Sequence, residues 1–143
     1  MSSFTVVECG APQSWDQWQF QHPELPLKAR GKRFLREELA LTGMEVSINS
    51  LPPGASMPFV HRHHANEELY VFLSGTGEFR VDDDVFPVKE GTMVRVAPPA
   101  RRVYRNTGAT PLLFLVIQAP DGQMASSHVA DGERVDEPLG LSG

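Results

Sequence analysis

The chain has 143 residues, of which 41% are hydrophobic and 22% are charged, and its formal net charge at pH 7 is -5. These values are typical of one soluble globular domain that is long enough to bury a core. The acidic balance, without long basic runs, argues against a nucleic-acid-binding surface and against a polybasic membrane patch. The single cysteine, Cys9, excludes an intrachain disulfide framework, and no apolar leader opens the sequence, so we expect a cytoplasmic protein.

Residues 1–43 are expected to form an arm and one short helix that pack on the rest of the chain. Phe4 to Glu8 is predicted to be a short strand. The aromatic residues Trp15, Trp18 and Phe20 follow, and we interpret them as a cover for the core or for a subunit interface. From Gly31 to Leu41, apolar residues recur every three to four positions. This spacing predicts a short amphipathic helix that ends at Thr42-Gly43.

From Met44 onward the pattern changes to alternation. Met44 to Asn49 alternates apolar and polar residues, as in a strand with one buried face. Asp82, Asp83 and Asp84 lack the spaced oxygen donors of a calcium loop, so we expect a hairpin connection there. Further strands are predicted at residues 68–73, 78–82, 85–88, 92–96, 103–105 and 112–118. This series indicates an all-β sandwich or barrel over residues 44–118, followed by a tail at 119–143.

A cluster of potential metal ligands lies between two of these predicted strands. His61 and His63 are two residues apart, so in an extended segment their side chains share one face, and His64 takes the other. Glu68 follows at the start of the next strand. Two imidazoles and a carboxylate on neighbouring strands form a site of mixed nitrogen and oxygen ligands for a divalent metal. We predict His61, His63 and Glu68 as metal ligands, with His64 as an alternative ligand or a residue supporting the site.

The same stretch resembles the first sequence motif of the cupins. In that motif two histidines separated by one residue are followed by a glutamate and then by a glycine. His61 and His63 fit the histidines, Glu68 fits the glutamate after four intervening residues, and Gly75 fits the glycine after six more. Gly54 precedes His61 by six intervening residues, where the motif has five.

The second cupin motif is matched only in part, between Gly91 and Asn106. If the motif is counted from both of these residues, its histidine falls on Arg102. If Pro98 is aligned with the motif proline instead, the histidine falls on Val103. Neither register supplies a histidine, so the fourth metal ligand of the family is missing from the sequence.

The resemblance implies a double-stranded β-helix jelly-roll barrel, commonly a homodimer, with a pocket inside the barrel. In family members with both motifs, three histidines and the glutamate hold iron, manganese, nickel or zinc. Here two histidines and one carboxylate would remain, which suffice for a metal centre with open positions. Arg102 would either clamp a substrate carboxylate or phosphate, or be a solvated strand residue.

The predicted strand at 68–73 also indicates what lines the pocket. If Glu68 faces inward, then so do Tyr70 and Phe72, which gives a mainly apolar wall suited to a small organic ligand. We therefore predict Tyr70, Phe72, Tyr104 and Arg102 as substrate-binding candidates. Leu69, Val71 and Leu73 would then face outward, where the N-terminal arm or a partner subunit must cover them. This supports the homodimer.

Two kinds of function follow from these features. The first is a metal-binding cupin that acts on a small organic molecule, as an oxygenase, isomerase or cyclase. The second is a non-catalytic or regulatory cupin that binds a small ligand beside a degenerate metal site. The intact pair of histidines with Glu68 favours the first function, whereas the missing second-motif histidine favours the second. The sequence does not identify the catalytic residues, the metal or the reaction.

Overall fold

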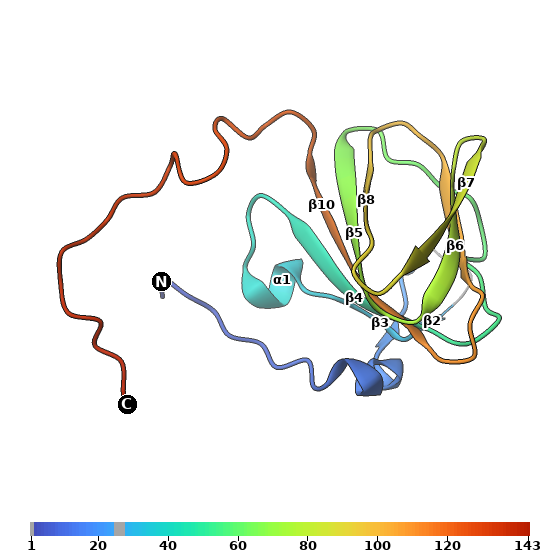
Figure 1. The fold of residues 1–143 in the computed structure, drawn as a ribbon, viewed down its shortest axis with the longest axis horizontal. Helices are drawn as coiled ribbons and strands as arrows, with labels where there is room; N and C mark the ends of the chain where they lie inside the picture. The colour runs from blue at the N-terminus through green and yellow to red at the C-terminus, as the bar shows by residue number, and fades with distance from the viewer. Residues whose placement is uncertain (1, 25–27) are drawn as a thin grey trace.

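The computed structural model describes residues 2–24 and 28–143, and these fold as an all-β protein (Figure 1). Two antiparallel sheets form the body of the molecule. The larger sheet has the strand order β3-β4-β10-β5-β8 and the smaller one has the order β7-β6-β9. Their strands are β3 (Lys32–Phe34), β4 (Glu45–Leu51), β5 (Asn66–Ser74), β6 (Thr76–Val81), β7 (Asp84–Lys89), β8 (Met93–Val96), β9 (Arg102–Asn106) and β10 (Leu112–Pro120). The predicted all-β fold is confirmed, and every strand predicted after Met44 is present.

The alternation of side chains in β5 sets the inner and outer faces of the larger sheet. Glu68, Tyr70 and Phe72 are buried, as expected from their spacing, and pair across β10 with Gln118, Val116 and Phe114. Because residues two apart share a face, all of these side chains point to the inside of the barrel. The order of strands therefore brings the carboxylate of Glu68 to the inner wall.

An aromatic core joins the two sheets. Phe79 on β6 is fully buried, and its ring centroid lies 4.8 Å from that of Tyr70 and 5.7 Å from that of Tyr104. Phe114 on β10 lies 5.3 Å from both Phe72 and Tyr104. Such offset and edge-to-face pairs add to the stabilisation that burial of the apolar surface provides.

The acidic connection between β6 and β7 is the predicted hairpin. Val81 pairs with Asp84, which leaves a two-residue loop of Asp82 and Asp83. Asp82 has a positive φ of 51°, a conformation that Asp tolerates better than most residues. Its Oδ1 accepts a hydrogen bond of 2.9 Å from the backbone N–H of Arg101.

The N-terminal arm covers part of the outer face of the larger sheet. It contains a 3-10 helix, η1 (Pro12–Gln17), and a two-stranded ribbon of β1 (Gln19–Phe20) and β2 (Ala29–Arg30). Trp15 is buried in a second apolar cluster with Leu35 and Ile48, and Leu73 from β5 packs against this cluster. Of the three outward-facing residues predicted on β5, Leu73 is thus covered by the arm.

One prediction for the N-terminal region is confirmed only in part, and another was wrong. Instead of a helix over Gly31 to Leu41, residues 32–34 form β3 and only α1 (Arg36–Leu39) is helical. Pairing of β3 with β4 outweighs the helical spacing, and Ala40 ends α1 in the left-handed conformation with φ of 56°. Phe4 to Glu8 forms no strand, because in the described part of the chain no neighbouring strand pairs with it, and Phe4 stays 73% exposed.

The C-terminal residues after β10 run along an exposed path without helix or strand, as Figure 1 shows. None of the helices in residues 2–24 and 28–143 is long and apolar enough to cross a membrane.

Candidate metal centre and cavity

The histidine stretch is extended and lies between β4 and β5, beside β9. His61 forms an isolated antiparallel bridge with Arg102, in which each backbone N–H donates to the carbonyl of the other, at 3.1 and 2.9 Å. His63, two residues on, turns to the same side, whereas Arg62 and His64 between and after them are exposed. The bridge to β9 therefore fixes the two imidazoles on the inner side of the barrel.

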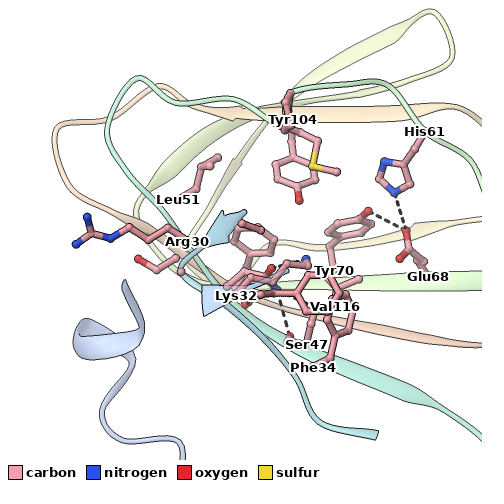
Figure 2. Close-up of a pocket in the computed structure, with 18 of the residues that line it drawn as sticks. Arg30, Lys32, Phe34, Ser47, Leu51, His61, Glu68, Tyr70, Tyr104 and Val116 are labelled. Atoms are coloured by element: carbon pink, nitrogen blue, oxygen red, sulfur yellow. Dashed lines mark hydrogen bonds and ion pairs between the residues drawn. The ribbon is translucent and has the colours of Figure 1, made fainter. Parts of the chain in front are cut away.

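The carboxylate of Glu68 is the centre of this cluster. Its Oε1 accepts a hydrogen bond of 2.8 Å from the Tyr70 hydroxyl, and its Oε2 lies 3.2 Å from His63 Nε2. His61 Nε2 lies 3.9 Å from Glu68 Oε1 (Figure 2). One potential donor atom from each of His61, His63 and Glu68 lies within 4.8 Å of the others. The predicted set of three residues is thus brought together in space.

The electrostatic environment keeps two of the three donors deprotonated at neutral pH. Burial lowers the pKa of His61 from 6.5 to about 4, with the nearby Glu68 carboxylate opposing this shift. Burial would raise the pKa of Glu68, but the hydrogen bonds from His63 and Tyr70 together with the charges of His63 and Arg102 outweigh it, so the pKa of this carboxyl is lowered. A neutral imidazole and an ionised carboxylate are the forms that bind a metal.

Arg102 completes the surroundings of Glu68. Its side chain is fully buried, and its Nε lies 3.5 Å from Glu68 Oε1. None of the three guanidinium nitrogens has a hydrogen-bond partner among the described residues. Since Arg102 is the residue bridged to His61, the structure favours the motif register in which Arg102, and not Val103, takes the place of the second-motif histidine.

A cavity of about 820 Å³ lies beside the cluster, and His61, His63 and Glu68 are part of its wall. Apolar and aromatic residues from both sheets, the arm and the loop before His61 form a large part of the remaining wall: Phe20, Phe34, Leu51, Met57, Pro58, Phe59, Tyr70, Tyr104, Phe114 and Val116. The charged residues of this remaining wall are Lys28, Arg30, Lys32 and Glu45. A cavity of this size and lining suits a small organic molecule with an apolar body.

The other predicted site residues fall in different places. Tyr70 and Tyr104 line the cavity, and burial raises the pKa of both phenols, so they are hydroxyl donors at neutral pH. Phe72 and Arg102 are enclosed in the interior and are not part of the cavity wall. His64 is exposed and does not join the cluster of three ligands.

Among the cavity residues that the sequence analysis missed, Lys32 is the one with the most distinctive environment. Lys32 on β3 lines the cavity, and its Nζ donates a hydrogen bond of 2.8 Å to Asn49 Oδ1. Burial lowers the pKa of Lys32 to about 8, although Glu68 and Glu45 oppose the shift. Lys32 lay in the part of the predicted helix that forms β3 instead. In a strand, Lys32 and Phe34 share one face and Arg33 takes the other. A strand prediction for this segment would therefore have placed Lys32 on the same inner face as Phe34.

Comparisons with known proteins agree with this geometry. The family model of the cupin domain matches residues 48–118. A crystal structure of a cupin protein from Bacteroides fragilis superposes with a TM-score of 0.70 and 38% sequence identity, over 81% of this chain and 97% of that one.

Two curated relatives match shorter stretches. An uncharacterised protein of Methanocaldococcus jannaschii is 31% identical over 79 residues, which are 54% of this chain and 63% of that protein. The oxalate-binding protein of Thermotoga maritima is 34% identical over 67 residues, or 47% of this chain and 54% of that protein. This chain therefore spans less than two thirds of the length of either curated relative.

Proposed function

Since this chain belongs to the cupins, we propose that it binds a small organic molecule in the barrel cavity, next to a divalent metal held by His61, His63 and Glu68. The observation that carries the proposal is the convergence of these three donors, within 4.8 Å of one another, on the wall of an 820 Å³ cavity. A metal ion at this position would be next to whatever the cavity holds.

The donor set fits a divalent metal. Two imidazole nitrogens and one carboxylate leave coordination positions open, as in catalytic metal sites of the two-histidine, one-carboxylate type. The lowered pKa values of His61 and Glu68 favour metal binding without a cost for removing their protons. The hydroxyl of Tyr70 donates to Oε1 of Glu68 and so fixes the orientation of this carboxylate beside His63.

The protein's own residues would position the ligand, and a bound metal would supply Lewis-acid polarisation of a ligand oxygen. Tyr104 keeps its phenolic proton at neutral pH and can donate a hydrogen bond into the cavity, whereas Tyr70 donates its proton to Glu68 and can only accept one from a ligand. The apolar walls exclude water from the rest of the ligand. These features support a metal-dependent small-molecule function.

A second candidate is a cupin that binds its ligand without metal. The observation that favours it is Arg102, whose guanidinium lies where the second-motif histidine is expected, 3.5 Å from Glu68. This permanent cation neutralises the carboxylate and repels a metal ion close by. In a metal-free cupin of this kind, Glu68 would only form part of the cavity wall, held in place by Arg102 and Tyr70.

Oxalate, the ligand in the name of the Thermotoga maritima relative, is one compound to test. The match to that relative covers only about half of each protein, and an ion as small as oxalate would leave most of the 820 Å³ cavity empty. We therefore favour a larger ligand with an apolar part.

Metal content distinguishes the two candidates. Tag-free protein is analysed by inductively coupled plasma mass spectrometry, as purified and after anaerobic incubation with ferrous ion followed by desalting. We expect near-stoichiometric iron, manganese, nickel or zinc in the unmodified protein and its loss in the His61→Ala/His63→Ala variant. The exposed His64→Ala variant is the matched control and should keep its metal.

The opposite results are equally informative. If the unmodified protein holds no metal even after reconstitution, the metal-free candidate is correct. If His64→Ala loses its metal while His61→Ala/His63→Ala retains it, the ligand assignment is wrong.

A further inference from the structure

We propose that the ammonium group of Lys32 anchors a carboxylate of the ligand, so that the cavity takes a small organic acid with an apolar body. This inference rests on the proposed function in one respect, that the cavity is the ligand site. It does not depend on whether a metal is bound.

A chain of hydrogen bonds holds the Lys32 side chain in place. Asn49 is 4% exposed, and its Nδ2 donates to Ser47 Oγ at 3.0 Å, which directs the amide oxygen to the other side. That oxygen accepts the 2.8 Å hydrogen bond from Lys32 Nζ. Lys32 Nζ also lies 5.0 Å from the centroid of the Phe34 ring, within the range of a cation–π contact. The ammonium is thus positioned by neutral partners.

No carboxylate in the protein neutralises this ammonium directly. Among the described residues no Asp or Glu oxygen lies within 4.0 Å of Lys32 Nζ, and the four remaining residues carry no side-chain carboxylate. An ammonium has three N–H donors, and Asn49 accepts only one of them. The other two donors are available on a largely apolar cavity wall. A lysine used only for solubility would instead extend its charge into water.

The position of Lys32 separates it from the histidine cluster. Lys32 lies on β3, at the edge of the larger sheet, where it pairs with Asn49. Glu68 lies on β5, three strands across from β3, and is level with Glu45. Figure 2 shows Lys32 and Phe34 on one side of the cavity and His61 and Glu68 on the other, with Tyr70 between them. The apolar part of an acid bound at Lys32 would therefore contact the aromatic and aliphatic wall of the cavity. It would extend from Lys32 toward the proposed metal.

The charge of the site favours a carboxylate over a phosphate. The other two basic residues of the cavity wall, Lys28 and Arg30, are exposed, so Lys32 is a single ammonium among neutral contacts. Such a group matches a monoanion, whereas a phosphate dianion is usually met by several cations or backbone N–H groups. Glu45 and Glu68 act on Lys32 electrostatically and would disfavour further negative charge. The pKa of about 8 leaves most of the Lys32 population charged at pH 7.

The test uses pairs of probes that differ only in charge. Benzoate, phenylacetate and isovalerate are compared with the corresponding amides by isothermal titration calorimetry at pH 7. We expect at least one acid to bind about ten- to a hundredfold more tightly than its amide, as for a hydrogen bond with a charged partner. Lys32→Met keeps the length of the side chain and should remove this preference by weakening the binding of the acid much more than that of the amide.

Three further variants make the outcome specific. Lys32→Gln retains a donor for Asn49 and should also lose the preference, which separates the charge from any effect of Lys32→Met on folding. Lys28→Met removes an exposed lysine from the rim of the same cavity and should leave the preference intact. His61→Ala/His63→Ala should likewise keep the preference, because the carboxylate is held by Lys32.

Several results would overturn the inference. One is that none of the acids binds more tightly than its amide. Another is that the preference survives in Lys32→Met and Lys32→Gln. If it is lost in His61→Ala/His63→Ala instead, the acid binds through the metal; the proposed function then stands while the role of Lys32 is wrong.

Discussion

A single residue, Arg102, separates the centre of this cupin from a four-ligand metal site. It bridges His61 across two antiparallel segments, so the two side chains point to the same face. Opposite residues in such a pair have Cβ atoms only about 5 Å apart. A histidine at this position could thus reach the metal proposed at His61, His63 and Glu68. The guanidinium of Arg102 instead repels a metal ion there, because it is always positively charged.

We predict that Arg102→His raises the affinity for divalent metal at least about tenfold, because it adds a neutral nitrogen donor and removes a positive charge. Competition with a metallochromic chelator measures the change. Arg101→His is the matched control, since Arg101 is exposed and pairs with Asp82 at the surface, and its metal affinity should stay unchanged. Equal affinities in unmodified protein and Arg102→His would contradict a metal position beside residue 102.

Lys32 gives the second prediction at this scale, which concerns pH. The acid binds the protonated lysine, whose pKa in the free protein is about 8 because of burial. Affinity for the acid should therefore be constant well below pH 8 and fall about tenfold per pH unit above it. For an unperturbed lysine the fall would begin only near pH 10.5.

Lys32 interacts electrostatically with three titratable groups, which are Glu45, Glu68 and His61. The pKa of Glu68 is lowered and that of His61 is about 4, so neither of these two titrates near pH 8. Calorimetric titrations from pH 6 to 10 test the prediction. The affinity of the matching amide should stay flat, and a flat profile for the acid as well would contradict an ionic anchor at Lys32.

At the scale of elements, β3 is the segment that connects the arm to the cavity. Gly31 donates its N–H to the carbonyl of Trp18 at 2.7 Å and accepts from the N–H of Ser50 at 2.7 Å. It has a positive φ of 72°, and a Cβ at this position would lie 2.2 Å from the Ser50 carbonyl oxygen. These contacts direct β3 along β4 and so place Lys32 on the inner wall.

Gly31→Ala should therefore destabilise the protein by more than about 1 kcal/mol, since both the backbone conformation and the contact with Ser50 oppose a side chain. Gly54→Ala is a matched control, because Gly54 has a similar φ of 76° but no atom within 4 Å of the added Cβ. Urea denaturation followed by circular dichroism measures both. If the two variants lose the same stability, the close approach of Gly31 to Ser50 does not contribute.

At the scale of the whole molecule, part of the outer face of the larger sheet is not covered by the arm. Leu69 and Val71 are half-buried, and Val71 pairs with Met93 on β8, which is 66% exposed. We propose that a second copy of the chain covers this apolar face, which gives the homodimer expected from the sequence.

Met93→Glu should shift the protein toward the monomer, because a carboxylate in an apolar interface loses its hydration. Size-exclusion chromatography with light scattering measures the mass of each species. Val85→Glu, which changes an equally apolar residue that is 56% exposed on β7, should leave the mass unchanged. A monomeric unmodified protein would contradict the proposal.

The barrel and its candidate ligands were predictable for local reasons. Strands alternate with period two, so the spacing of Glu68, Tyr70 and Phe72 identified the inner face of β5 directly. His61 and His63 share a face for the same reason. The helix predicted over Gly31 to Leu41 was wrong for the part that forms β3. The residue spacing there fits a helix as well as a strand, and only pairing with β4 distinguishes the two.

The sequence by itself determined the strand pattern, the family resemblance and the set of His61, His63 and Glu68, since each depends on residue types at short spacings. The tertiary structure decided what depends on contacts between distant segments. It placed Arg102 against Glu68, from β9 to β5, and Lys32 beside Asn49, from β3 to β4. The charges of Arg102 and Lys32 affect the electrostatics of the site because both side chains are buried beside residues 17 or more positions away in the chain. A local sequence pattern contains no information on such contacts.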